Sequence, residues 1–320
     1  VADASTTDTR YAISVGDLEL DAAALNALDG KTDSAIVITA ANKITGDLTN
    51  LEKVYNTNRA NFDGEGAELV TVTDTALDAA LLNTINTKTT GVVTVSSSAT
   101  SISGTDAAVK TALTNSGSGV AGLIKTGASI SDLDVTIVHS AAGLADAENI
   151  DAIAGVDGSL VANGLTSGTV TLGAKVTGIT GTKANVDEVL KLYQPATATP
   201  PTQVRVSGLD GLRVEISNSQ TLDAIKTLIT TYPNIGVVKS TVTTTTSALA
   251  SYATLPAGNE LSFTVDDDAI ADVSVLNALA AKTTGTITLD PTTGAKTSPA
   301  VTGSAAELAK YFNNAKIAVA

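Results

Sequence analysis

Few side chains in this sequence could carry out catalysis. His139 is the only histidine, so it is the only imidazole that could act as the base of a Ser–His–Asp arrangement. It lies in the apolar segment 135–140, which is typical of a strand, and the sequence contains no Gly-x-Ser-x-Gly elbow. The Gly-rich segment 117–119 lacks the lysine of a phosphate-binding loop. We therefore interpret His139 as structural and expect a protein that is not an enzyme and has no catalytic residues.

Clustered acidic residues make calcium the one candidate cofactor. Asp266, Asp267, Asp268 and Asp272 place oxygen ligands close together in the sequence, and so do residues 63–68. Neither cluster has the spacing of an EF-hand loop, and no Gly-Gly-x-Gly-x-Asp nonapeptide occurs. We favour the interpretation that these carboxylates cap a helix or face solvent. A calcium-dependent shift in melting temperature would identify a site; no other cofactor is expected.

A repeated asparagine is the third polar feature. Asn26, Asn83 and Asn277 each follow a leucine in three similar segments. Contact with a ligand along one face is one interpretation. We favour the other, in which each amide forms a hydrogen bond with a neighbouring turn, as polar ladders do in solenoids. No Lys–Asn pair stands out as the site of an isopeptide bond.

Composition excludes several classes of function. The formal net charge is −14, from 33 acidic and 19 basic residues, which disfavours binding to nucleic acid. Apolar runs are too short to span a bilayer, so we expect no membrane insertion. Cysteine is absent, which excludes disulfides and thiolate ligands. Aromatic residues make up only 3%, so the core must be built from Ala, Val, Ile and Leu, which suits thin and regular layers.

The three segments around the repeated asparagine share one pattern, here called the Asn motif. It spans residues 17–32, 74–89 and 268–283. Each copy has an Asp at the first and fifth positions, then Leu-Asn, an aliphatic residue and Lys-Thr. The first Asp suits a helix N-cap, and apolar residues at helical spacing follow it. Short β-rich runs precede the motif at residues 12–15, 69–72 and 261–265.

A second pattern, here called the Gly motif, follows each Asn motif. After an alternating strand it reads Ile/Val, Thr/Ser, Gly and a capping residue, at 44–47, 102–105, 179–182 and 301–304. Positions 4, 7 and 8 after the cap are apolar in all four copies. A glycine and an N-cap followed by such a stripe predict the start of a helix.

Together the motifs predict about five strand–helix–strand–helix units. Alternation of short strands and helices favours right-handed crossovers and an α/β fold with a parallel sheet. We expect a solenoid-like arrangement with extra β segments; a doubly wound sheet is the alternative. A Pro/Thr-rich linker at 195–202 is expected to divide a repeat region at 1–194, of about three units, from one at 203–320, of about two.

The segments LDAALLNTINTKTTGVVTV (77–95) and SISGTDAAVKTAL (101–113) resemble repeats of very large, adhesin-like surface and secreted proteins of cyanobacteria and marine bacteria. The resemblance covers roughly half of the chain. It implies an extracellular repeat protein with a role at a cell surface, in an appendage or in a matrix. It provides no catalytic residues.

We therefore expect an extracellular or cell-surface structural protein whose partners are copies of itself. We interpret the chain as the processed product of a secreted precursor; a fragment of a larger protein is the alternative. The open ends of the chain would join head to tail into a filament, tube or surface layer. The residues expected at these ends are Val1, Tyr11, Lys316, Ile317 and Val319. The alternative is an adhesive module that binds calcium or glycans. A secreted hydrolase is the third interpretation, but no acidic pair is flanked by the Trp or Tyr that usually bind sugar rings.

Overall fold

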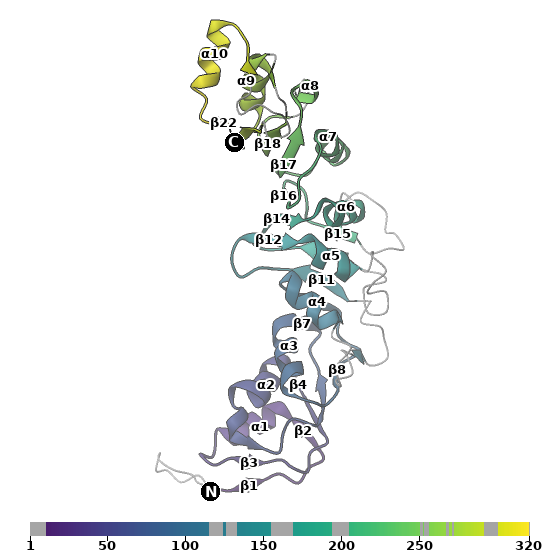
Figure 1. The fold of residues 1–320 in the computed structure, drawn as a ribbon. Coiled ribbons are helices and arrows are strands. Elements are labelled where there is room, and N and C mark those ends of the chain that lie inside the picture. The colour runs from purple at the N-terminus through teal and green to yellow at the C-terminus, as the bar shows by residue number, and fades with distance from the viewer. Residues whose placement is uncertain are drawn as a thin grey trace. The chain divides into compact units, whose positions relative to one another are not determined.

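The computed structural model describes residues 11–114, 124–125, 133–154, 169–193, 205–249, 252, 256–266, 269–270, 272–290 and 300–319 (Figure 1). The chain divides into two compact units. The first comprises residues 1–141, 149–175 and 198–207, and the second comprises 142–148, 176–197 and 208–320. The linker expected at 195–202 lies outside the described residues, so the division expected there stays a prediction.

All described strand pairs are parallel. The first compact unit holds three sheets, with strands in the orders β1 (Ile13–Ser14), β3 (Ile36–Val37), β5 (Phe62–Asp63); β10 (Ile124–Lys125), β8 (Val93–Val95), β6 (Leu69–Val72), β4 (Lys43–Gly46), β2 (Glu19–Asp21); and β15 (Arg205–Ser207), β13 (Thr169–Leu172), β11 (Asp134–Ile137), β9 (Ser101–Gly104), β7 (Ala76–Asp78). Of the β-rich runs predicted before the Asn motif, 69–72 forms β6, and 12–15 contains β1.

The second compact unit holds a larger sheet and a strand pair. The order of the larger sheet is β12 (Gly143–Asp146), β14 (Val176–Gly181), β16 (Arg213–Ile216), β17 (Val238–Thr244), β18 (Glu260–Val265), β20 (Ile287–Leu289), β22 (Ile317–Val319). The pair is β19 (Ala269–Ile270) with β21 (Ala300–Val301). The α/β class with parallel sheets is thus confirmed.

Helices follow the strands, and we call each helix, with the strands that precede it, a coil. They are α1 (Ala22–Asp29), α2 (Leu48–Glu52), α3 (Ala79–Lys88), α4 (Asp106–Thr114), α5 (Ala147–Ala154), α6 (Lys183–Leu192), α7 (Leu222–Thr231), α8 (Thr246–Leu249), α9 (Val273–Lys282) and α10 (Ala305–Phe312). A π-helical turn, η1 (Lys53–Thr57), extends α2, and a 3₁₀ turn, η2 (Arg59–Asn61), follows it. The Asn motif forms α1, α3 and α9, and the Gly motif forms α2, α4, α6 and α10.

The caps explain where these helices begin. In the Gly motif the capping side chains of Asp47, Thr182 and Ser304 each accept a hydrogen bond from a backbone N–H of the first turn, as predicted. In the Asn motif the prediction that the first Asp caps the helix is wrong. The N-caps are the second aspartates, Asp21, Asp78 and Asp272, because a short strand occupies the residues between the two aspartates.

Glycine in the Gly motif permits close packing between consecutive coils. A Cβ added at Gly46 would lie 2.7 Å from the Cβ of Ala22, the first residue of the preceding helix. The same contact recurs at 2.8–3.0 Å in the other copies, which pair Gly104 with Ala79, Gly181 with Ala147 and Gly303 with Val273. Glycine therefore suits this position because a Cβ would crowd the side chain at the start of the previous helix.

Candidate assembly surfaces

Side-chain amides join each Asn-motif helix to the next helix. Asn26 Nδ2 donates to the carbonyl of Asn50 (3.0 Å), Asn83 Nδ2 to that of Ala108 (2.8 Å) and Asn277 Nδ2 to that of Glu307 (2.9 Å). In each case the acceptor is the third residue of a Gly-motif helix. The repeated asparagine thus forms hydrogen bonds between coils, as favoured above.

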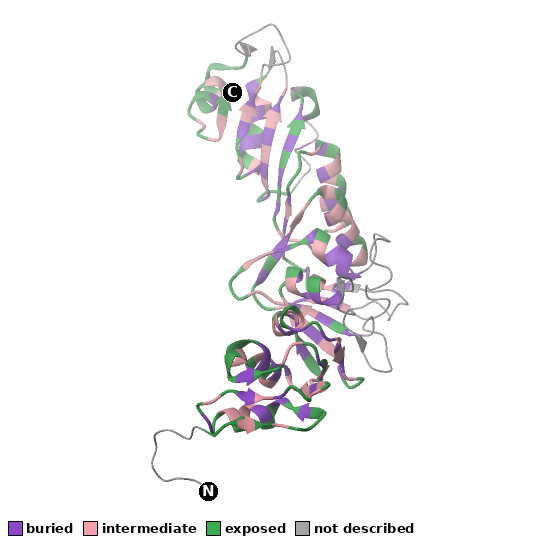
Figure 2. Ribbon diagram, turned by 60° about the horizontal axis from the view of Figure 1, so that its bottom comes forward, coloured by how far each residue is buried: buried purple, intermediate pink, exposed green. Residues whose placement is uncertain are grey.

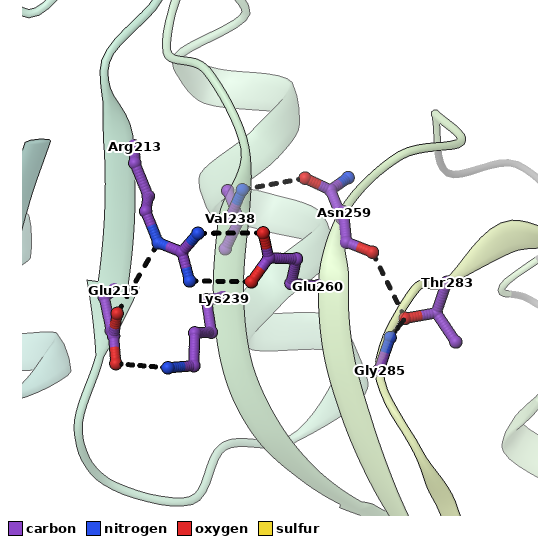
Figure 3. A network of polar contacts seen from close by, with 8 residues as sticks. All are labelled: Arg213, Glu215, Val238, Lys239, Asn259, Glu260, Thr283 and Gly285. Atoms are coloured by element: carbon purple, nitrogen blue, oxygen red, sulfur yellow. Dashed lines mark hydrogen bonds and ion pairs between the residues drawn. The ribbon is translucent and has the colours of Figure 1, made fainter. Parts of the chain in front are cut away.

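Threonine joins the same coils in the opposite direction. Thr283 Oγ1 donates towards the carbonyls of Leu261 (2.6 Å) and Asn259 (3.2 Å) and accepts from Gly285 N–H (3.0 Å) (Figure 3). Thr89 is also buried and bonds to Gly66 and Gly91. The Lys-Thr pair of the Asn motif therefore anchors each turn to the coil before it.

Charged side chains link three strands of the larger sheet. Arg213 Nη1 and Nη2 donate to the two carboxylate oxygens of Glu260 at 2.8 and 2.6 Å, and these residues lie on β16 and β18 with β17 between them (Figure 3). Lys239 on β17 donates to Glu215 Oε1 at 2.7 Å. Paired, partly exposed charges of this kind contribute modestly to stability.

Asp74, the first aspartate of the second Asn motif, has a role that the sequence did not reveal. Asp74 Oδ2 accepts a hydrogen bond from Leu48 N–H (2.7 Å), the first backbone N–H of the preceding Gly-motif helix. Asn218 Oδ1 accepts in the same way from Lys183 N–H (2.9 Å), at the start of α6. A side chain from one coil thus caps the helix of the previous coil, because the first N–H groups of a helix have no partner within it.

Large apolar side chains are exposed at the first and last described coils. Phe312 is 73% exposed in α10, whereas Tyr55, Leu113 and Leu190 are buried at the same position of the other Gly motifs. Leu28 is 37% exposed in α1, whereas Ile85 and Leu279 are buried at the same position of the other Asn motifs. Equivalent positions of one motif are therefore buried in some copies and exposed in α1 and α10. Figure 2 shows exposed residues among the helices of the described chain.

The residues predicted at the assembly ends have varied surroundings. Val1 lies outside the described residues. The side chain of Tyr11 is exposed, and its carbonyl accepts from Thr32 Oγ1 (2.9 Å). Ile317 and Val319 belong to β22, which pairs with β20. Lys316 is used within the chain, because its ammonium group donates to the carbonyls of Ala280 (2.9 Å) and Thr283 (2.8 Å) at the end of α9.

Only two of the four predicted calcium ligands, Asp266 and Asp272, lie among the described residues. Asp267 and Asp268 lie outside the described residues, and Asp266 follows β18. Asp272 caps α9 by accepting from Ser274 N–H (2.8 Å), and this hydrogen bond lowers the pKa of its carboxyl group. No group of three or more potential His, Asp or Glu ligands is found in the part of the chain that the structure describes.

The second acidic cluster bonds to protein groups. Buried Glu68 accepts from Gly66 N–H (2.7 Å) and from the hydroxyl of Tyr55 (3.2 Å). Burial raises the pKa of Tyr55, and the charge of Glu68 raises it further. Glu65 forms an ion pair with Arg59 at 3.0 Å. These contacts hold the loop between η2 and β6.

His139 connects three segments of the first compact unit. Its Nε2 lies 3.1 Å from Asp106 Oδ1 at the start of α4, and Asp106 Oδ2 accepts from Asn149 Nδ2 (2.8 Å) in α5. The imidazole and the carboxylate are largely buried, and the cluster joins successive coils.

Two general findings complete the description of the surfaces. Among the helices that the structure describes, none has the length and apolar character needed to cross a bilayer. Comparison of the chain with protein-family models, with curated proteins and with solved structures finds no match.

Proposed function

We propose that this chain is an extracellular structural protein whose copies assemble head to tail. The observation that carries the proposal is the exposure of Phe312, at a position that is buried in every other Gly motif. Phe312 is exposed at the motif position where the other copies have a buried side chain. We interpret this as a surface that a second molecule covers. The resemblance of residues 77–95 and 101–113 to repeats of surface proteins supports an extracellular location.

Strand order supports a solenoid-like stack. In every described sheet the strands follow one another in chain order without reversal. A doubly wound sheet contains such a reversal at its switch point. The helices α1 to α10 give five pairs, in line with five strand–helix–strand–helix units. Hydrogen bonds from Asn83 and Thr89 then link each coil to the next and to the previous one.

The two exposed ends differ from each other, which determines the kind of assembly. The first coil presents an Asn-motif helix with Leu28 exposed, and the last presents a Gly-motif helix with Phe312 exposed. Contact between two different surfaces of identical subunits repeats indefinitely unless the geometry closes into a ring. The Asn and Gly motifs continue to alternate across the contact if α1 of one molecule follows α10 of another. A filament or tube is the expected product.

We expect the substitution Phe312→Gln to abolish long polymers of the purified chain, because it removes the largest exposed apolar side chain of the last coil. Sedimentation velocity and electron microscopy over a range of concentrations measure the effect. Leu69→Gln is the matched control, since Leu69 is 49% exposed but lies on β6, which belongs to neither terminal coil. A parent chain that remains a discrete particle at high concentration would contradict the proposal and favour the adhesive alternative.

A further inference from the structure

From α2 to α6 the coils alternate between two numbers of strands and follow one pairing rule. Coils ending in α3 and α5 contain three strands each, β5–β6–β7 and β10–β11–β12, whereas coils ending in α2, α4 and α6 contain two. The coils ending in α7, α8 and α9 depart from this alternation, with two, one and two described strands. The first strand of a three-strand coil pairs with the first strand of the preceding coil, as β5 does with β3 and β10 with β8. The second pairs with the second, as β6 does with β4 and β11 with β9. The third strand begins a new sheet.

The last described strands stop part of the way through this rule. The coil of α10 contains β20 and β21. Strand β22 pairs with β20, as the first strand of a three-strand coil pairs with the first strand of the coil before it. A second strand would pair with β21, whose one neighbour in the described part of the chain is β19. The free edge of β21 is thus the position that the rule assigns to a second strand.

The first described coil lacks the complementary part. Its strands β1 and β2 pair with β3 and β4 of the following two-strand coil. In the complete coils this is how the second and third strands behave, since β6 pairs with β8 and β7 with β9. Within the described residues, the coil of α1 therefore has a second strand, a third strand and a helix, but no first strand.

Building on the proposed function, we propose that each joint completes one coil from two molecules. Strand β22 of one copy supplies the first strand, and β1, β2 and α1 of the next copy supply the remainder. The new strand β1 then pairs in parallel with β21. Inside the chain, β4 and β6 pair Ile44 with Val70 and Thr45 with Thr71. The equivalent register at the joint places Val301 beside Ile13 of the second copy, and Thr302 beside its Ser14.

Asp17 has a defined partner in this joint. Inside the chain, Asp74 accepts from the first N–H of α2 at 2.7 Å. Asp17 occupies the same position of the first Asn motif, and Ala305 is the first residue of α10. At the joint the Asp17 carboxylate of the second copy accepts from Ala305 N–H, where the helix dipole favours a negative charge.

The apolar contact follows from the same register. Tyr55 and Ile85 are buried on η1 and α3, which contact each other. Phe312 and Leu28 are their equivalents at the joint, so α1 of the second copy covers α10. We therefore propose a second copy of this chain as the partner at this end. It supplies strand β1, the capping carboxylate of Asp17 and the apolar face of α1 together.

Engineered cysteines test this register, because the chain contains none of its own. We expect a mixture of Ser14→Cys and Thr302→Cys chains to form a disulfide-linked dimer on mild oxidation. Both side chains are exposed, and parallel strands lie about 4.8 Å apart, which suits the roughly 4.4–6.8 Å Cα separation of a disulfide. Replacing Ser14→Cys by Ser98→Cys, an exposed position in the middle of the chain, provides the control.

The outcomes separate the two proposals. Cross-linking of Ser14→Cys with Thr302→Cys, and much less with Ser98→Cys, supports the split coil, and mass spectrometry of the linked peptides identifies the pair. Polymers that form without this cross-link would overturn the split coil and leave head-to-tail assembly standing. Absence of any polymer of the parent chain would overturn both.

Discussion

We expect the Gly91→Ala variant to be less stable than the parent protein by about 3 kcal/mol, at the upper end of the usual cost of overpacking. A Cβ at Gly91 would lie 1.7 Å from the carbonyl oxygen of Glu68. This neighbour is backbone of the preceding coil, so no side-chain rotation relieves the clash. Gly91 N–H also donates to Thr89 Oγ1 (2.9 Å), and displacement of the loop would weaken that bond.

Urea denaturation followed by far-ultraviolet circular dichroism measures this loss. Gly30→Ala is the control, because a Cβ there meets no atom closer than 3.7 Å and its φ of −68° suits alanine. A Gly91→Ala variant as stable as Gly30→Ala would show that the coils are not packed as closely as described.

The second large effect is expected at Thr283. The Thr283→Val variant keeps the shape of this buried side chain but removes the hydroxyl that donates to Leu261 and accepts from Gly285. Because the buried carbonyl and N–H lose a partner, we expect the free energy of unfolding to fall by roughly 2 kcal/mol.

Thr284 provides a control within the same Lys-Thr-Thr sequence. Its side chain is exposed, so Thr284→Val should leave the denaturation midpoint nearly unchanged. Equal midpoints for Thr283→Val and Thr284→Val would contradict the anchoring role of the buried hydroxyl. Proteolysis between β18 and β20 would report any local loosening.

Much of the local structure follows from the sequence because its determinants are local. The caps Asp47, Thr182 and Ser304 and the apolar stripes after them predict helices that the structure contains. Side chains within one turn of a helix decide such features, and the spacing of residues records them directly.

The third strands were not predicted because they are too short. Strand β7 has three residues, of which only Leu77 is buried, so no alternating pattern marks it. This unrecognised strand is why Asp74 was assigned to its own helix rather than to the preceding one. The exposure of Phe312 could not be predicted either, since its motif matches that around buried Tyr55 and only the neighbouring coil distinguishes them. The calcium prediction at Asp267 and Asp268 falls outside the described residues.

The ion pair between Arg213 and Glu260 is expected to resist pulling on the larger sheet. When force acts along the direction in which strands stack, it loads the successive interstrand pairings in series, so the narrowest pairing yields first. In the larger sheet, β16 and β17 share only two residue pairs, Val214 with Val238 and Glu215 with Lys239. The ion pair between Arg213 on β16 and Glu260 on β18 spans this pairing. Because both side chains are partly exposed, dissolved salt weakens their attraction. Rupture force in a pulling experiment should therefore fall as ionic strength rises, making the surrounding medium a regulator of tensile strength.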